Sequence, residues 1–399
     1  MNILHVISSA NPMGGGPIEG VRNLGQRMQE LGHHTELVTL DNPADAWLQN
    51  QTQTVHALGP ARGAYGMNKR LVPWLVAHAH QYDFVIVNGI WQYHSFATWR
   101  ALTRLKQPYA VFTHGMLDPW FKRTYPLKHL KKWLYWPWAE YRVLRDAAAV
   151  LFTCEDERLL ARESFWLYRV REQVVAYGTR PPPTDKAMLT ARFLDTYPEL
   201  KGKRLLLFLS RIQEKKGCDL LISAFAKAAA QTPDLHLVMA GPDQTGWVAA
   251  LQAQARQLGV ADRIHWPGML QGDTKWGAFH AAEAFVLPSH QENFGIAVAE
   301  ALGCGLPVLI SNKVNIWREI ESAGAGLVEE DTDDGTQALL MQWLALEPAA
   351  RAGMAQAASQ LFNDRFTVNA MVESLLSLIR AQLNQEPHQM RHRNTGDVL

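Results

Sequence analysis

Four charged residues in the second half of the chain have the types and the spacing needed to bind a phosphorylated ligand. Arg211 and Lys216 lie in a polar loop that follows the apolar run at residues 204–209. A guanidinium can hold a phosphate through two parallel hydrogen bonds, and an ammonium can act on it as a point charge. Glu292 and Glu300 lie eight positions apart, after another apolar run. Because a carboxylate can accept hydrogen bonds from the two hydroxyls of a ribose, the four residues together indicate a site for a nucleoside diphosphate.

The two glutamates bracket a predicted strand, loop and helix. Residues 284–288 form a short apolar run that predicts a buried strand, and the alanine-rich segment after Gly295 predicts a helix. The first amides of a helix have no partner within it, so those of Phe294 and Gly295 can face an anion. On a continuous helix, Glu292 and Glu300 would lie about 80° apart, so we expect them to have different roles. An ordinary surface loop with two solvated acids is the alternative.

Two features of the first half also place polar groups after apolar runs. Three glycines, Gly14 to Gly16, follow the run at residues 3–7 and permit close approach of the backbone to a ligand. They match G-x-G-x-x-G poorly, because Gly20 comes one position late, and a flexible turn is the alternative. His114 follows the run at residues 109–113. Its place at a strand end favours contact with a ligand over the alternative of a satisfied core histidine.

Short apolar runs alternate with helical patterns along most of the chain. This alternation predicts parallel sheets that are covered by helices on both faces, with ligands beyond the carboxyl ends of the strands. The pattern restarts after a stiff, polar linker at residues 178–184, so we expect two doubly wound domains. The expected strands are residues 3–7, 35–40, 84–88, 109–113, 147–153 and 173–176, then 204–209, 235–240, 263–266, 284–288 and 307–311.

Length and composition agree with two globular domains. A chain of 399 residues is too long for one typical core, and 47% hydrophobic with 19% charged residues is usual for globular proteins. A formal net charge of +1 argues against a nucleic-acid binder. Cys154, Cys218 and Cys304 are too far apart to suggest a disulfide framework or a zinc site, which fits a reducing cytosol. The apolar runs are too short for a signal peptide or a membrane span.

Aromatic and basic residues alternate from Trp120 to Arg145. Such a mixture can lie in a membrane interface or bind an anionic partner, and the alternative is that the aromatics fill the core while the cations stay solvated. Pro126 and Pro137 should divide the segment into short helices. The aromatics are Trp120, Phe121, Tyr125, Trp133, Tyr135, Trp136, Trp138 and Tyr141, and the cations are Lys122, Arg123, Lys128, Lys131, Lys132, Arg142 and Arg145.

The ordered set of motifs resembles that of the retaining family 4 glycosyltransferases. The stretch from Glu292 to Glu300 is similar to their E-x7-E motif, and residues 210–217 resemble their Arg and Lys loop. Residues 113–118, the glycines at 14–16 and the linker fall where the patterns of that family fall. The resemblance extends from the first strand to the tail helix.

The resemblance implies a GT-B architecture, in which two Rossmann-like domains face each other across a cleft. The domains would be an acceptor domain at residues 1–180 and a donor domain at 181–365. A helix at 366–384 would cross back to the first domain, and we expect a disordered tail at 385–399. The implied reaction moves a hexose, with retention, from a nucleotide-diphosphate sugar such as a UDP- or GDP-sugar. The acceptor would be a hydroxyl of a glycan or lipid-linked glycan, in exopolysaccharide, O-antigen or other surface polysaccharide synthesis.

Carried over to this sequence, the family pattern assigns a role to each motif residue. Arg211 and Lys216 would hold the diphosphate. Glu292 would contact the hydroxyls of the donor sugar, Glu300 the ribose, and His114 the sugar from the first domain. The other expected contacts are Gly15, Gly16, Met269, Asn293, Phe294 and Gly295 for the donor, and Tyr93 and Asp118 for the acceptor side.

In the implied mechanism the acceptor attacks from the face that the leaving diphosphate departs from, and the diphosphate helps to remove the acceptor proton. The protein then aligns the reactants and stabilises charge, without a cofactor or a metal. The sequence Asp331-Thr332-Asp333 matches the metal-binding D-x-D of another glycosyltransferase class. We interpret it here as solvated surface.

Other functions use similar scaffolds. A sugar-nucleotide epimerase or a phosphorylase is the nearest alternative, and an NAD-dependent dehydrogenase is more distant because the glycine fingerprint is imperfect. A non-catalytic subunit that binds a partner through its Trp and Lys segment is the alternative from another class. We expect the protein in the cytoplasm or on the inner face of the cytoplasmic membrane, where the segment from Trp120 to Arg145 would contact anionic lipid.

Overall fold

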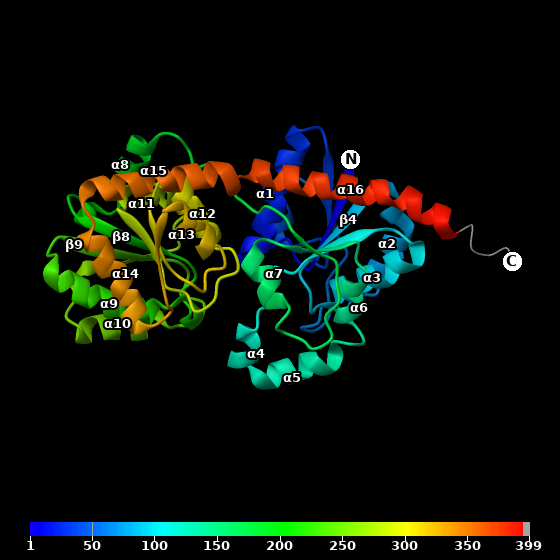
Figure 1. The fold of residues 1–399 in the computed structure, drawn as a ribbon, viewed down its shortest axis with the longest axis horizontal. Coiled ribbons are helices and arrows are strands. Elements are labelled where there is room, and N and C mark those ends of the chain that lie inside the picture. The colour runs from blue at the N-terminus through cyan, green and yellow to red at the C-terminus, as the bar shows by residue number, and fades with distance from the viewer. Residues whose placement is uncertain (50, 394–399) are drawn as a thin grey trace. The chain divides into compact units, whose positions relative to one another are not determined.

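Two α/β units make up the described part of the chain, residues 1–49 and 51–393, in the computed structural model (Figure 1). Unit 1 comprises Met1–Gly178 and the chain from Val368 onward. Unit 2 comprises Thr179–Thr367. Each unit has one sheet whose strand pairs are parallel, so the prediction of two doubly wound domains is confirmed.

The sheet of unit 1 has seven strands in the order β3-β2-β1-β4-β5-β6-β7. All five residues of the central strand β4 are buried, as expected where helices cover both faces of a parallel sheet. The strands are β1 Asn2–Ile7, β2 His34–Thr39, β3 Thr54–Ala57, β4 Phe84–Asn88, β5 Tyr109–Phe112, β6 Ala149–Phe152 and β7 Glu172–Val174.

The sheet of unit 2 has six strands in the order β10-β9-β8-β11-β12-β13. Its core strands are runs of large apolar residues, and every residue of β9 and β11 is buried. The strands are β8 Arg204–Leu209, β9 Leu235–Ala240, β10 Ile264–Gly268, β11 Ala284–Leu287, β12 Val308–Ser311 and β13 Gly326–Glu329.

Two strands, β3 and β13, were not predicted from the sequence. Each lies at the edge of its sheet and is only partly buried. An edge strand has a neighbour on one side alone, so its sequence carries less of the apolar signal that marks central strands. The expected strands that correspond to β4, β8 and β9 have the same bounds in the structure.

Helices cover the sheets of both units. Unit 1 has α1 Gly16–Glu30, α2 Leu71–His78, α3 Tyr93–Leu105, α4 Trp120–Thr124, α5 Pro126–Tyr135, α6 Glu140–Arg145, α7 Glu155–Ala161 and α16 Val368–Arg393. Unit 2 has α8 Lys186–Thr196, α9 Cys218–Gln231, α10 Val248–Gln257, α11 Gly272–Ala281, α12 Ile296–Gly303, α13 Trp317–Ala323, α14 Asp333–Ala345 and α15 Pro348–Arg365.

The tail helix α16 packs against α1 within unit 1. Arg27 on α1 donates to the Asn369 side chain at 2.6 Å, and Val372 and Ile379 of α16 are fully buried. The helix α16 extends to Arg393, and residues 394–399 of the predicted tail lie outside the described residues. Once the buried part of a helix has formed, each added residue gains a backbone hydrogen bond without a new nucleation cost.

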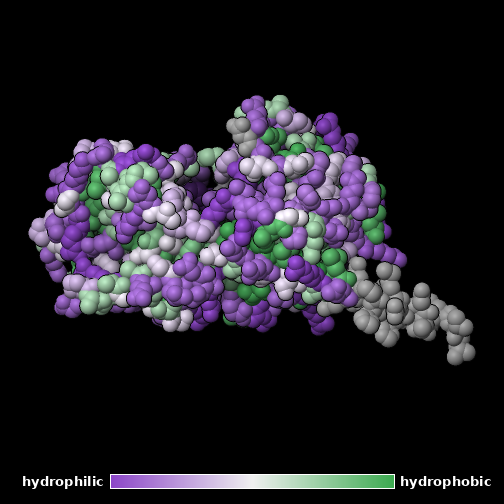
Figure 2. Space-filling view, turned by 90° about the horizontal axis from the view of Figure 1, so that it is seen from above, coloured by the Kyte–Doolittle hydropathy of each residue, from purple (hydrophilic) through white to green (hydrophobic). Residues whose placement is uncertain are grey.

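The aromatic and basic segment forms three helices, α4, α5 and α6, as the prolines predicted. Its aromatic residues divide between the two interpretations, because Trp136 and Tyr141 are buried while Trp138 is 70% exposed. Figure 2 shows a different face, seen from the side of α16, where hydrophilic residues cover most of the surface. In the described part of the chain, no helix is long and apolar enough to cross a membrane.

Candidate functional site

The strand order of unit 2 reverses between β8 and β11, and the loops that follow these two strands lie against each other. The amide of His290 donates to the carbonyl of Lys215 at 2.9 Å. Gly217 has a φ of 64°, and a Cβ at this position would lie 2.1 Å from the carbonyl oxygen of Pro288. Glycine therefore allows the loops to touch at the point where doubly wound sheets bind their ligands.

Lys216 and Glu292 form an ion pair between these two loops. The Lys216 side chain is 3% exposed and the Glu292 side chain 21%. The backbone of Glu292 is held on both sides, since its amide donates to Lys313 at 2.9 Å and its carbonyl accepts from Asn315 at 3.0 Å. Two of the predicted site residues, 76 positions apart, are thus brought together with little freedom to move.

Cations surround the carboxylate of Glu292. Burial alone would raise its pKa, but Lys216, Lys215 and Arg211 outweigh that effect and hold the pKa below its usual range. Three positive charges around one carboxylate leave an excess of positive charge in the absence of ligand. This balance suits a diphosphate, whose negative charge would be costly beside Glu292 without such compensation.

Arg211 is exposed, although its neighbours anchor the loop. Ile212 is buried and its amide donates to Pro242 at 3.1 Å. Gly241 approaches so closely that a Cβ there would lie 1.7 Å from the carbonyl oxygen of Ser210. The backbone of Arg211 is therefore fixed while its guanidinium remains accessible to a ligand.

The helix that carries Glu300 begins immediately after Gly295, which adopts a left-handed conformation with φ 77°. Phe294 is 4% exposed and packs edge-on against Phe366, with ring centroids 5.5 Å apart. The amides at the start of α12 are consequently positioned by a buried aromatic contact. Asn293 precedes them in the same loop, and Met269 follows β10 with its side chain 54% exposed.

Glu300 has a cationic partner that the sequence did not reveal. Its carboxylate lies 2.7 Å from the ammonium of Lys275 on α11, and the two side chains are 6% and 20% exposed. The ammonium of Lys275 also lies 4.3 Å from the centroid of the Trp276 ring. A lysine on a helix at the protein surface ordinarily faces solvent, so nothing in the sequence marks Lys275 as a partner of Glu300.

Unit 1 has its own reversal of strand order, between β1 and β4, and a polar cluster lies there. Asn88 ends β4, and its side-chain amide donates to His5 at 3.2 Å and to the Ile86 carbonyl at 3.3 Å. That orientation turns the Asn88 carbonyl oxygen towards His114, whose Nε2 lies 3.4 Å away. The backbone carbonyl of Asn88 accepts from His94 at 3.0 Å. The predicted ligand residue His114 is thus one of three histidines around one asparagine.

His114 adopts a left-handed backbone conformation with φ 48°, which is uncommon for a residue with a side chain. Its ring stacks on Phe112 at 5.3 Å and meets Tyr177 edge-on at 6.2 Å. Burial, with a smaller contribution from His5, lowers the pKa of His114 to about 3. The imidazole is therefore neutral at pH 7, with Nε2 donating to Asn88 and Nδ1 available as an acceptor.

Glu157 holds the loop that carries His114, and the sequence did not identify it. One oxygen of its carboxylate accepts from the Thr113 hydroxyl at 2.7 Å and from the Gly115 amide at 2.6 Å. The other accepts from the amide and the hydroxyl of Thr153, both at 2.7 Å. Glu157 is 4% exposed, so this buried carboxylate connects β6 and α7 to both neighbours of His114.

The three histidines predict that acid destabilises unit 1. Burial lowers the pKa of His5 and of His94 to about 4, and that of His114 to about 3, from 6.5. Below pH 6.5 the unfolded chain takes up protons that the folded unit does not bind. These histidines therefore contribute their full stabilisation above pH 6.5, and this stabilisation is lost as the pH falls from 6.5 through the pKa values of the folded unit. The loss is at most ~1.4 kcal/mol per histidine for each pH unit.

Urea denaturation of unit 1, followed at pH 7, 6 and 5, measures this effect. The midpoint should fall at each step, and the fall should be smaller in His5→Asn, which removes one of the titrating rings. Equal midpoints at pH 7 and pH 5 in the unsubstituted protein would contradict the expectation.

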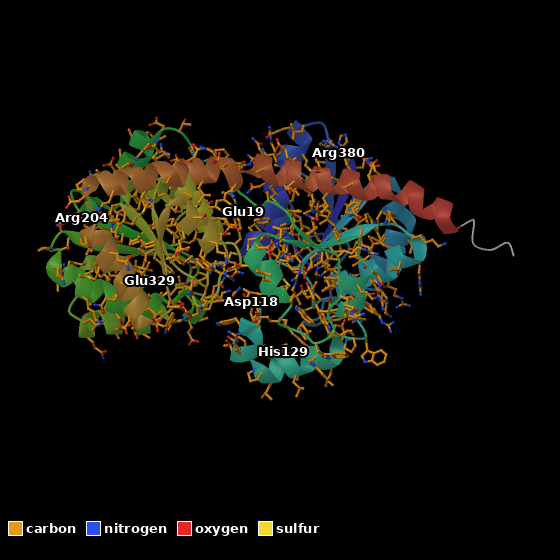
Figure 3. The ribbon with its side chains drawn as sticks, viewed as in Figure 1. Glu19, Asp118, His129, Arg204, Glu329 and Arg380 are labelled. Atoms are coloured by element: carbon orange, nitrogen blue, oxygen red, sulfur yellow. The ribbon has the colours of Figure 1, made fainter. Side chains whose placement is uncertain are left out.

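The remaining predicted contacts of unit 1 lie at the same edge of its sheet. Gly15 has φ 76° and immediately precedes Gly16, the first residue of α1, and its amide donates to the Pro12 carbonyl at 3.2 Å. Tyr93 begins α3, and its ring meets Tyr65 edge-on at 6.0 Å. Asp118, labelled in Figure 3, is 8% exposed and accepts from the amide of Trp120 at 2.8 Å. That hydrogen bond gives Asp118 a structural role at the start of α4.

Two residues of the D-x-D sequence, Thr332 and Asp333, are exposed, as the interpretation as solvated surface expects, whereas Asp331 is partly buried. The carboxylate of Asp331 is 23% exposed and lies 2.9 Å from Nδ1 of His290 and 3.7 Å from Lys313. Asp331 thus joins β13 to the loop that carries Glu292. Within the residues that the structure describes, no group of three or more His, Cys, Asp or Glu side chains is arranged to hold a metal ion.

Comparison with known proteins agrees with this geometry. A model described as "Glycosyl transferase 4-like domain" matches residues 15–178, and one described as "Glycosyl transferases group 1" matches residues 193–361. A D-inositol 3-phosphate glycosyltransferase of Segniliparus rotundus is 30% identical over 210 residues. The matched stretch covers 50% of this chain and 44% of that relative, so the chain spans less than half of its length in the alignment.

Solved structures share the fold over nearly the whole chain. Anabaena Alr3699/HepE in complex with UDP and glucose aligns with a TM-score of 0.76 and 17% identity, covering 96% of this chain and 100% of that one. WaaG, a glycosyltransferase involved in lipopolysaccharide biosynthesis, aligns with a TM-score of 0.66 and 18% identity over 94% and 99% of the two chains. These likenesses show a GT-B fold, and because the two family models together match more than half of the sequence, the chain belongs to the family 4 glycosyltransferases.

Proposed function

We propose that this protein is a retaining glycosyltransferase that moves a hexose from a nucleotide-diphosphate sugar to a hydroxyl of a glycan or lipid-linked glycan. Unit 2 would be the donor domain and unit 1 the acceptor domain. One observation carries the proposal: the buried pair of Lys216 and Glu292 lies, with Arg211 beside it, where the strand order of unit 2 reverses. Family membership supports the reaction type.

The site residues have complementary roles in this proposal. Arg211 and Lys216 hold the diphosphate, with the amides of Phe294 and Gly295 beside it. Glu292 accepts hydrogen bonds from hydroxyls of the donor sugar and so positions the sugar. Its ion pair keeps the ammonium of Lys216 in place. Glu300 accepts hydrogen bonds from the hydroxyls of the ribose, while the ion pair with Lys275 holds its carboxylate in place. The other donor contacts proposed are Gly15, Gly16, Met269 and Asn293, and those on the acceptor side are Tyr93 and Asp118.

The reaction itself proceeds by departure of the diphosphate and attack of the acceptor hydroxyl from the same face. The bond from the anomeric carbon to the phosphate oxygen breaks, a bond to the acceptor oxygen forms, and the acceptor proton passes to the leaving diphosphate. Lys216 and Arg211 stabilise the charge that develops on that diphosphate. His114, neutral and fixed by Asn88, contacts the sugar as a hydrogen-bonding partner. No step requires a metal ion.

The donor base and the pathway belong to the proposal as well. The similar fold of HepE, which was solved with UDP and glucose, supports a UDP-sugar, with a GDP-sugar as the other candidate. The likeness to WaaG supports an acceptor in cell-surface polysaccharide synthesis. A lipid-linked acceptor would place the enzyme in the cytoplasm at the inner face of the membrane.

A thermal-shift panel of UDP-, GDP- and ADP-sugars tests the proposal. A matched donor at about 100 times its Kd should stabilise unit 2 by about 2.7 kcal/mol and raise its Tm, whereas the mismatched bases should have little effect. The same donor should not stabilise Lys216→Met to this extent. If no nucleotide sugar raised the Tm of the unsubstituted protein, the donor site would be wrongly assigned. Conversion of the donor to an epimer, without transfer, would favour the epimerase.

A further inference from the structure

The helix α5 presents an apolar face to solvent. Leu127, Leu130 and Leu134 are 78%, 55% and 63% exposed. At about 100° per residue, these three side chains lie within about 60° of one another around the helix axis. In Figure 1, α5 lies at one end of unit 1, away from α16, and Figure 3 shows side chains projecting outward from it. The leucines therefore form one outward face, which we call the leucine face.

The opposite face of α5 is already occupied by the rest of unit 1. The ring of His129 stacks on Phe165 at 4.8 Å, and the ammonium of Lys132 lies 4.5 Å from the centroid of the Trp91 ring. Trp136, which follows the helix, is fully buried and donates to the Leu167 carbonyl at 2.7 Å. These contacts fix the rotation of α5, so the leucine face cannot turn inward without breaking them.

Exposed tryptophans adjoin the leucine face. Trp133 and Trp138 come from α5 and the turn after it, and they are 42% and 70% exposed. Trp166 is 66% exposed, and its ring lies 6.2 Å from that of Trp133. Tryptophan has an apolar body with a polar N–H, and it is enriched where apolar and aqueous phases meet.

The charges within residues 119–139 have one sign, although Arg123 lies 3.8 Å from the carboxylate of Glu163 outside that segment. Residues 119–139 contain five lysines and arginines and neither Asp nor Glu, although the whole chain has a net charge of only +1. Lys128 and Lys131 are exposed on α5 itself, and Lys122 and Arg123 on α4. A solvent-facing apolar stripe bordered by cations is the composition that binds the surface of an anionic bilayer.

We propose that the leucine face, with Trp133, Trp138 and Trp166, docks unit 1 on a membrane whose headgroups are anionic. The leucines and the indole rings enter the boundary between headgroups and acyl chains, and the lysines and arginines contact lipid phosphates. This inference rests on the proposed function, because it identifies the acceptor as one carried by a lipid rather than by a free glycan.

The inner face of α5 connects the docked surface to the acceptor side of the site. Trp91, which contacts Lys132, has φ 72°, and its indole N–H donates to the Met116 carbonyl at 3.1 Å. Met116 follows His114 by two positions in the loop after β5. One aromatic residue therefore lies between the docking helix and the His114 loop. A lipid-linked acceptor at the membrane surface would reach the site beside this contact.

Flotation with vesicles tests the proposal on the full chain. We expect the protein to float with vesicles of phosphatidylcholine and phosphatidylglycerol at least about tenfold more than with phosphatidylcholine alone. The pair Leu127→Ser and Leu134→Ser, and separately Lys128→Glu and Lys131→Glu, should each reduce this binding about tenfold or more. The matched control Leu31→Ser with Leu258→Ser also removes two exposed leucines, 47% and 45% exposed, and should float like the unsubstituted protein.

Two results would overturn the docking proposal: no flotation of the unsubstituted protein with the anionic vesicles, or full flotation of the α5 leucine variant. Binding to a soluble polyanion that the leucine substitutions leave unchanged, without flotation, would instead assign the surface to an acidic polymer. The rise in Tm caused by the nucleotide-sugar donor distinguishes failure of the docking proposal from failure of the proposed function. A variant that no longer floats should keep its donor shift, whereas loss of the donor shift in a protein that floats would refute the glycosyltransferase site alone.

Discussion

Replacing Lys216 with methionine is expected to lower kcat for sugar transfer by about 10²–10³-fold, the usual effect of removing one preorganised group that stabilises developing charge. Methionine fills a similar volume but cannot compensate the charge on the departing diphosphate. The substitution also leaves Glu292 without its partner between the two loops of unit 2. Steady-state kinetics with the matched donor, together with urea denaturation, measures both effects.

Two further variants separate the loss of catalysis from the loss of stability. In Lys216→Met alone, the unpaired carboxylate should cost up to about 3 kcal/mol of unfolding free energy. Adding Glu292→Gln removes that charge, so the double variant should regain stability but not activity. Lys215→Met is the comparison: it also removes a cation near Glu292 but leaves the ion pair between the loops intact, because Lys215 contacts Gln291 at 3.2 Å, so it should lower kcat less than Lys216→Met does. If Lys216→Met kept the full transfer rate, Lys216 would not act on the diphosphate.

Replacing Glu157 with glutamine is expected to lower kcat and to destabilise unit 1 by about 1–3 kcal/mol, the cost of leaving buried polar groups unsatisfied. The carboxylate accepts four hydrogen bonds, from Thr113, Gly115 and Thr153. A glutamine amide has only one oxygen, so its NH2 group must face donors on one side. If the NH2 group faces Thr113 and Gly115, the loop that carries His114 loses the contacts that fix both of its ends; if it faces Thr153, the link from that loop to the end of β6 is lost.

The kinetic parameters distinguish positioning of His114 from general loss of stability. Because Glu157 lies in unit 1 and the proposed diphosphate-binding residues Arg211 and Lys216 lie in unit 2, Glu157→Gln should lower kcat at a temperature where the variant remains folded and leave the thermal shift by the nucleoside diphosphate without its sugar unchanged. Glu155→Gln, two positions away on the same helix, is the control, since Glu155 is exposed and pairs with Arg158 at the surface. Unchanged kcat in folded Glu157→Gln would show that the carboxylate does not position His114.

The central strands could be predicted because each of them is a run of consecutive, mostly apolar residues. Strands such as Phe84–Asn88 and Leu235–Ala240 are covered on both faces, and this requires side chains that avoid water at every position. The edge strands Thr54–Ala57 and Gly326–Glu329 are only partly buried, so their composition resembles that of a loop. They form because a neighbouring strand supplies hydrogen-bonding partners. That neighbour comes from another part of the chain, so the local sequence does not reveal the pairing.

The same distinction applies to the site. Residue type and position after a strand were sufficient to select Arg211, Lys216, Glu292 and His114, because parallel strands bring their carboxyl ends to one edge. The partners that orient these groups carry no such signal. Three acidic residues begin α7, and only packing decides that Glu157, rather than Glu155 or Asp156, is the buried one. Lys275 was overlooked for the same reason.

Local pattern alone thus predicted two doubly wound units, the loops at their strand ends and the residue types that would meet an anionic donor. Tertiary packing decided which charges are paired, as for Lys216 with Glu292 and Lys275 with Glu300. Packing also decided the rotation of α5, in which His129 and Lys132 face inward while the leucines face solvent. Helical periodicity defines the faces of a helix, but the free energy of contact with neighbouring aromatic rings determines which face is buried.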